Sequence, residues 1–277
     1  MIEEDEEGGE AAEPFNRENY DHFVENDFRD VKVYPLSTFS ADVDTGSYAN
    51  VRRMLNAGIL PPKGAVRVEE MINYFDYDYA GPDGDDVFAA HFALSECPWN
   101  ERRQLLRVGL KGREPSDERK AMNLVFLIDV SGSMQSRAKL SLVKSSLSQL
   151  VEQMDDKDRI AIAVYAGASG LALPSTSGSD KGRILGCLDR LRSGGSTNGG
   201  AGIKLAYATA ADNFIKDGVN RVILCTDGDF NVGVSSQSAL IDLIKEKAKS
   251  GVFLSVFGFG AGNYNDSMLV KLANNGN

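Results

Sequence analysis

The chain is poor in the residues that build zinc sites and disulfide frameworks. Among 277 residues it has two histidines and three cysteines. His22 and His91 are far apart and neither has a cysteine pair beside it, so the sequence predicts no zinc site. Cys97, Cys187 and Cys225 are odd in number and widely spaced, and the last two lie in apolar patterns. We therefore expect buried thiols that serve packing.

The chain also lacks a basic field. Its formal charge is −10, but seven of its 40 acidic residues fall in the first thirteen positions, so 33 acidic residues face 30 basic ones in the rest. A nearly neutral body does not attract nucleic acid electrostatically, and we expect no nucleic-acid partner. The acidic start predicts a solvated, disordered tail over residues 1–27.

Long apolar runs are missing as well. No stretch of about 18 apolar residues could span a membrane, and the start lacks a signal-peptide pattern. No phosphate-loop signature occurs, and the glycine-rich run from Gly258 to Gly262 lacks the full dinucleotide-binding spacing, so it predicts a tight turn.

What remains is the pattern of an α/β protein. From Met122 onward, apolar segments that suit buried strands alternate with segments of helical spacing, which predicts a doubly wound, mostly parallel sheet flanked by helices. The predicted strands are 123–128, 159–166, 170–173, 221–225 and 252–259. Helical stripes are centred on Leu147, Leu188, Tyr207 with Phe214, and Ile244, and a last helix is expected to be capped by Asp266. The sequence stops at Asn277 where the alternation calls for another strand, so we expect a truncation there.

The segment before Met122 predicts a smaller α+β domain. A strand over 36–43, helices over 48–56 and 66–75, and strands over 87–95 and 104–110 fit its pattern. The predicted division is a tail over 1–27, an amino-terminal extension over 28–118 and the α/β domain over 119–277.

Oxygen-bearing side chains follow three predicted features of the α/β domain. Asp129, Ser131 and Ser133 come directly after strand 123–128, Thr197 lies in the loop SGGSTNGGAG, and Asp227 follows strand 221–225. Ligands of open α/β sheets bind at the carboxyl ends of strands, so we expect these loops to converge. Carboxylates and hydroxyls suit Mg²⁺ or Mn²⁺, with Ca²⁺ as an alternative. Two carboxylates leave a divalent ion able to attract the Asp or Glu of a protein partner.

In order and position, these residues resemble the metal-ion-dependent adhesion site of von Willebrand factor type A domains. The resemblance implies that Asp129, Ser131 and Ser133 contact the ion, that Thr197 does so in an open, ligand-bound form, and that Asp227 acts directly or through water. It also implies a shift of the last helix and the Thr197 loop on ligand binding. Neighbouring residues expected to support the ligands are Ser196, Asn198, Gly228 and Asp229.

The front half carries a second resemblance. TFSADVDTGSYANVRR and RVEEMINYF are similar to the amino-terminal extension of a bacterial cell-envelope subgroup of these proteins, whose members have a further carboxyl-terminal region. The resemblance implies a bacterial origin and an extracytoplasmic setting. Together the two resemblances predict a metal-dependent protein-binding or adhesion module that is not an enzyme.

Two enzymatic alternatives stay open. Asp42 and Asp44 could form the nucleophile motif of a haloacid-dehalogenase-like phosphatase, although the predicted helices that follow favour a helix-capping role for Asp44 or Thr45. The metal could instead activate water in a hydrolase. The sequence places no base or histidine triad near the five ligands, which favours binding over turnover.

Overall fold

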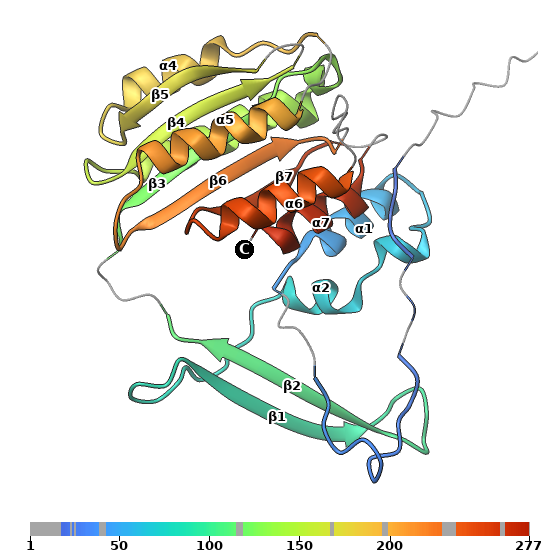
Figure 1. Cartoon of the computed structure of the whole chain (residues 1–277). Helices are drawn as coiled ribbons and strands as arrows, with labels where there is room; N and C mark the ends of the chain where they lie inside the picture. The colour runs from blue at the N-terminus through green and yellow to red at the C-terminus, as the bar shows by residue number, and fades with distance from the viewer. Residues whose placement is uncertain are drawn as a thin grey trace, which may run out of the picture. The chain divides into compact units, whose positions relative to one another are not determined.

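The computed structural model describes residues 18–22, 24, 26–38, 43–114, 119–166, 169–195, 199–228, 237–260 and 264–276. The chain forms two compact units, one of His22–Arg119 and one of Lys120–Asn277 together with Met1–Asp21 (Figure 1). Of the predicted tail, residues 1–17 lie outside the described residues. No helix in the described part of the chain has the length and apolarity to cross a membrane.

The larger unit is built on a five-stranded sheet in the order β5-β4-β3-β6-β7. β3 pairs in parallel with β4 and β6, and β7 pairs in parallel with β6, whereas β5 is an antiparallel edge strand. This mixed sheet confirms the α/β prediction. Its strands are β3 (Met122–Asp129), β4 (Arg159–Tyr165), β5 (Ser169–Ser177), β6 (Val219–Thr226) and β7 (Phe253–Gly258).

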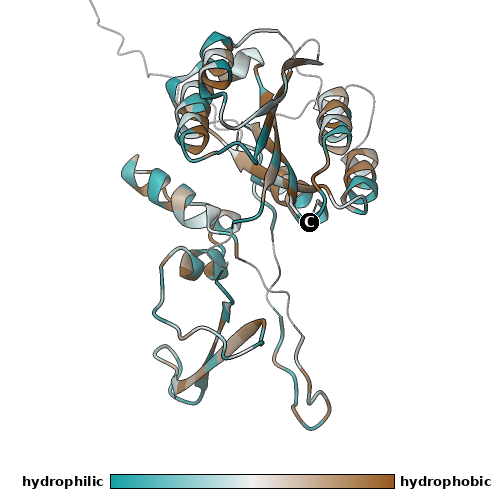
Figure 2. Cartoon of the chain, turned by 90° about the vertical axis from the view of Figure 1, so that its left-hand side faces the viewer, coloured by the Kyte–Doolittle hydropathy of each residue, from teal (hydrophilic) through white to brown (hydrophobic). Residues whose placement is uncertain are grey.

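Helices cover both faces of the sheet, as the continuous apolar run of β3 requires. α3 (Leu142–Glu152) and α4 (Lys181–Arg190) share one buried cluster with Phe126, whereas α5 (Gly199–Asp212) and α6 (Gln237–Ala248) share the opposite cluster with Leu127. α7 (Asp266–Asn275) contributes Met268 to that second cluster. The sheet is accordingly apolar between helices that are mostly hydrophilic outside (Figure 2).

Two details of the helices differ from the sequence prediction. The sequence pattern assigned Phe214 to the same helix as Tyr207, but α5 ends at Asp212. Phe214 lies beyond the helix with 47% of its surface exposed, because its helical spacing from Tyr207 continues after the helix has ended. α7 is capped by Asn265, whose side chain accepts a hydrogen bond from the Met268 amide at 3.2 Å, so Asp266 occupies the first turn instead of the cap.

Residues 18–21, assigned to the tail by the sequence pattern, contact the start of α7. The Asn19 amide donates to the Tyr264 carbonyl at 3.0 Å, and Ser267 Oγ donates to Asp21 Oδ1 at 2.6 Å. Lys271 Nζ lies 2.9 Å from Asp21 Oδ2. Hydrogen bonds to a distant segment explain why a polar stretch takes a defined position here.

In its described residues, the smaller unit contains two helices, a short 3₁₀ turn (Lys63–Ala65) and an antiparallel pair of strands. Its elements are α1 (Gly46–Asn56), α2 (Val68–Asn73), β1 (Phe88–Glu96) and β2 (Gln104–Gly112). α2 is shorter than the predicted 66–75. The predicted strand over 36–43 is wrong where the structure describes it, because residues 36–38 and 43 are irregular; residues 39–42 lie outside the described part.

A buried polar network joins α1 to α2. Glu70 Oε2 accepts a hydrogen bond from the Ser47 amide at 2.8 Å, and Ser47 Oγ donates to the Ala65 carbonyl at 2.6 Å. The Arg67 guanidinium pairs with the Glu70 carboxylate. Thr45 occupies the N-cap position of α1 without a side-chain cap bond, so Glu70 satisfies the helix start from a distance of 23 residues.

We expect Glu70→Gln to destabilise the α1–α2 pair by about 2 kcal/mol, because it weakens a charge-assisted bond and leaves Arg67 without its countercharge. Hydrogen exchange of residues 46–73 measures this loss. Glu69→Gln, at the neighbouring exposed position, is the matched control and should leave protection unchanged. Equal protection in both variants would contradict the assigned role of Glu70.

Candidate metal centre

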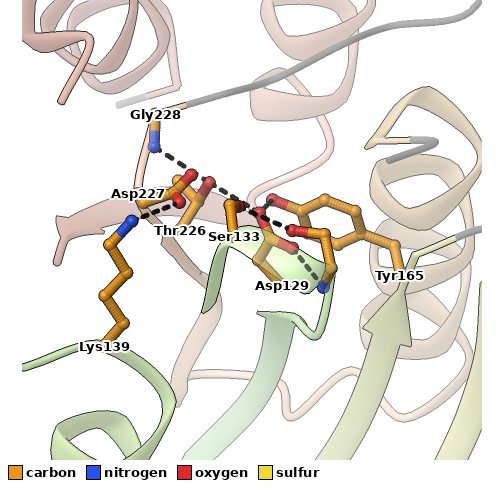
Figure 3. Close-up of polar contacts among 8 residues, drawn as sticks. Asp129, Ser133, Lys139, Tyr165, Thr226, Asp227 and Gly228 are labelled. Atoms are coloured by element: carbon orange, nitrogen blue, oxygen red, sulfur yellow. Dashed lines mark hydrogen bonds and ion pairs between the residues drawn. The ribbon is translucent and has the colours of Figure 1, made fainter. Parts of the chain in front are cut away.

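The candidate site lies at the carboxyl edge of the three central strands. β3 lies between β4 and β6, so the strands that follow it in sequence are added first on one side and then on the other. Such a change in strand order leaves a crevice at the carboxyl ends of the strands, where α/β proteins bind ligands. Asp129 ends β3, Tyr165 ends β4 and Thr226 ends β6, with Asp227 next in the chain. Figure 3 shows these side chains gathered at one edge.

Asp129 accepts hydrogen bonds from three neighbouring residues. Its Oδ1 accepts a hydrogen bond from the Ser131 amide at 2.8 Å, and its Oδ2 accepts from Tyr165 Oη and Thr226 Oγ1, each at 3.2 Å (Figure 3). The side chain is fully buried. Burial raises the pKa of Asp129 and the charge of Asp227 adds to the rise, whereas hydrogen bonds from Ser131 oppose it. The site therefore holds a carboxylate whose negative charge is poorly solvated.

Tyr165 supports this carboxylate from β4. Burial raises the pKa of its phenol well above the usual value, and the charge of Asp129 acts in the same direction. The phenol is therefore protonated and donates to Asp129. Gly202 makes room for it, because a Cβ there would lie 2.9 Å from the Tyr165 Cβ, so α5 approaches the sheet closely at this point.

Two hydroxyls lie beside Asp129. Ser131 Oγ and Ser133 Oγ are 3.0 Å apart, on a 3₁₀ turn (Gly132–Gln135) that is held down by the fully buried Met134. The Gly132 amide donates to the Gly195 carbonyl at 3.2 Å. The strand end thus presents both serine hydroxyls next to the Asp129 carboxylate, and the chain leading to the Thr197 loop is bonded to the same turn.

Some predicted site residues lie outside the described part of the chain: Ser196, Thr197, Asn198 and Asp229, as does Asp42. Gly228 is described, and its amide donates to Thr226 Oγ1 at 3.2 Å. Its φ of +87° and the 2.7 Å between a Cβ built there and the Asn265 amide nitrogen both favour glycine. The turn after β6 therefore packs tightly against the cap of α7.

Lys139 was missed by the sequence reasoning. It lies in a π-helical turn (Arg137–Ser141) before α3, and its Nζ is 2.9 Å from Asp227 Oδ2 (Figure 3). Lys139 is 7% exposed and Asp227 fully buried, so this is a buried ion pair. Tyr165 and Thr226 could have been found, since each ends a strand at the site edge. No sequence pattern marks Lys139.

The donor set fits a hard divalent cation. Asp129 and Asp227 provide carboxylate oxygens and Ser131 and Ser133 provide hydroxyl oxygens, which Mg²⁺ and Mn²⁺ accept. Within the described ranges, no group of three or more His, Cys, Asp and Glu residues could hold a metal by itself. Among the described residues, the Ser131 hydroxyl lies within hydrogen-bonding distance of the Ser133 hydroxyl, which is not a base that could activate it as a nucleophile.

We predict that Asp129→Asn leaves the melting temperature of the metal-free protein unchanged or raises it. The raised pKa of Asp129 means that its ionised form costs stability above its unfolded-state pKa, and an amide avoids that cost. An Asn oxygen can still accept from Ser131, and its NH₂ can donate to Thr226. Thermal unfolding in EDTA at pH 7 measures the change, with Ser131→Ala as a site variant that keeps the charge. A clear drop for Asp129→Asn would contradict this account.

Comparison with known proteins gives the family. The model of the von Willebrand factor type A domain matches residues 123–277, and a model described as von Willebrand factor matches residues 14–107. The chain is 50% identical over 266 residues to the uncharacterized protein YfbK of Escherichia coli K12, covering 93% of this chain and 46% of YfbK. The chain thus spans about half the length of that relative.

More distant matches cover a little over half of the chain. Mouse inter alpha-trypsin inhibitor heavy chain 4 is 25% identical over 159 residues, which make up 54% of this chain and 17% of that protein. The solved structure of manganese-loaded Plasmodium vivax TRAP protein matches with a TM-score of 0.46 and 20% identity, over 56% of this chain and 62% of that one. The match of the domain model to more than half of the sequence shows that the chain belongs to the von Willebrand factor type A family.

Proposed function

We propose that this chain is a metal-dependent protein-binding module rather than an enzyme. Domains of its family are often metal-dependent interaction modules. The observation that carries the proposal is the buried Asp129 carboxylate, which has Asp227 and the Ser131 and Ser133 hydroxyls at the same strand edge. A buried negative charge with hard oxygen neighbours is what a divalent cation neutralises.

The chain's own residues have distinct parts in this function. Asp129, Ser131 and Ser133 hold the ion from one turn, Asp227 holds it directly or through water, and Thr197 joins them from its loop. A bound Mg²⁺ or Mn²⁺, or Ca²⁺ as an alternative, supplies a Lewis-acidic position for an oxygen anion. Tyr165 orients Asp129, and Gly228 fixes the turn that carries Asp227.

The ligand is a protein that presents an Asp or Glu carboxylate. Two carboxylates and neutral hydroxyls leave a coordination position of the ion to water, and an acidic side chain binds by replacing that water molecule. Hydrolysis by the same metal is the less favoured function, because neither His22 nor His91 lies near the strand-end residues in the sequence. The resemblance of the amino-terminal segment to bacterial envelope members supports a partner in the cell envelope as part of this proposal.

We expect the wild-type chain to bind Mg²⁺ or Mn²⁺ in a calorimetric titration and Asp129→Ala to lose that binding. At an ion concentration one hundred times the Kd, binding adds about 2.7 kcal/mol to stability, which a thermal shift detects independently. Asp156→Ala removes an exposed carboxylate of the same unit and is the control for nonspecific charge effects. Undiminished binding by Asp129→Ala would show that the ion binds elsewhere.

We also expect a partner that depends on the ion. The immobilised chain, incubated with the envelope fraction of its source organism, should retain a protein in Mg²⁺ and release it in EDTA, and Asp129→Ala should retain none. Mass spectrometry identifies the partner, and substituting its contact Glu or Asp by the amide should abolish capture. Retention that persists in EDTA would argue for a metal-independent surface.

A further inference from the structure

We propose that Lys139 couples metal binding to ligand binding: its buried ammonium weakens the affinity of the centre for the cation alone and makes an anionic ligand part of a stable complex. The inference rests on the proposed function. It adds a residue that determines the specificity of the site and that the predicted ligand set does not contain.

The first support is the ion pair itself. Lys139 Nζ lies 2.9 Å from Asp227 Oδ2, with 8% of the lysine side chain and none of the aspartate side chain exposed. In the metal-free protein the ammonium thus compensates the charge of one proposed ligand. Burying two opposite charges is tolerable only with such close contact, so Asp227 and Lys139 depend on each other.

The second support is the confinement of the lysine. Its amide donates to the Ser136 carbonyl at 3.1 Å, which fixes the backbone in the π-helical turn. Its methylene stem runs against Gly260 just after β7, where a Cβ would overlap the Lys139 Cε and Cγ atoms, and the φ of Gly260 is +98°. Packing therefore holds the Lys139 ammonium next to Asp227. The charge of a solvent-exposed lysine would be screened by water and would affect the site far less.

The charge balance gives the direction of the effect. A divalent ion is neutralised by the two carboxylates of Asp129 and Asp227, so the Lys139 ammonium leaves the loaded centre with one surplus positive charge. Two cations near the same buried carboxylate repel each other strongly, because the protein interior screens charge poorly. A ligand carboxylate cancels the surplus, so ion and ligand each strengthen the binding of the other.

Calorimetric titration of Mg²⁺ and Mn²⁺ into the full chain tests this. Lys139→Met keeps the stem and Lys139→Gln keeps an N–H donor, and both remove the charge; each should tighten metal binding about tenfold or more. Lys139→Arg retains the charge and should stay near the wild-type affinity. Lys144→Met, on α3 where Lys144 bonds to the Asp189 carbonyl, is the matched control and should have no effect.

A second readout uses acetate as the carboxylate probe. Acetate should strengthen metal binding by the wild type more than by Lys139→Met, because the variant has no surplus charge to cancel. If one neutral variant folds poorly in EDTA, the rise in melting temperature on adding metal ranks the variants instead of the titration. In such a variant the ion replaces the Lys139 charge that compensates Asp227, so the rise should be larger than in the wild type. Greater shifts for the neutral variants support the proposal.

Unchanged or weaker metal binding by both neutral variants, in the presence of normal binding by the wild type, would overturn the role of Lys139 and leave the proposed function intact. Binding by Lys139→Met without detectable binding by the wild type would support the inference. Absence of binding by the wild type and by every variant would overturn both the inference and the proposed function.

Discussion

The charge of Asp129, buried at the end of the central strand, is the constraint around which the site is arranged. It follows a run of five apolar residues, Leu124 to Ile128, and its side chain has no exposed surface. Hydrogen bonds from Tyr165 on β4 and Thr226 on β6 compensate part of the lost hydration. The two flanking strands are therefore tied to β3 by their side chains as well as by their backbones.

That constraint reaches into the packing of the helices. α5 lies close to Tyr165 because Gly202 has no side chain: a Cβ there would lie 2.9 Å from the Tyr165 Cβ. On the other side of the strand edge, the buried Met134 fixes the turn that presents Ser131 and Ser133. Core packing on both sides of the strand edge thus sets the positions of these oxygen atoms, which is the preorganisation that the proposed cation site requires.

Much of this arrangement could be predicted from local patterns. The apolar runs of β3, β4 and β6 specify buried strands, and the carboxyl ends of neighbouring parallel strands must share an edge, which brings Asp129 and Asp227 together. The contacts that the sequence did not predict join segments far apart in the chain. Lys139 reaching Asp227 and Glu70 reaching the start of α1 are contacts between distant segments, and neither residue type is expected in a core. The predicted N-cap of α7 is wrong by one residue. Asn and Asp are both favourable N-cap residues, so the sequence alone does not decide between Asn265 and Asp266.

The contacts around Asp227 also connect the site to the last helix. Gly228 packs against Asn265, which caps α7, and Lys139 lies between Asp227 and Gly260 after β7. A change in the charge around Asp227 therefore acts on the residues at both ends of the segment that joins β7 to α7. The resemblance to adhesion domains implies a shift of this helix on ligand binding. Because neither glycine position has room for a side chain, the lysine and the β6 turn lie directly against the backbone at the two ends of that segment.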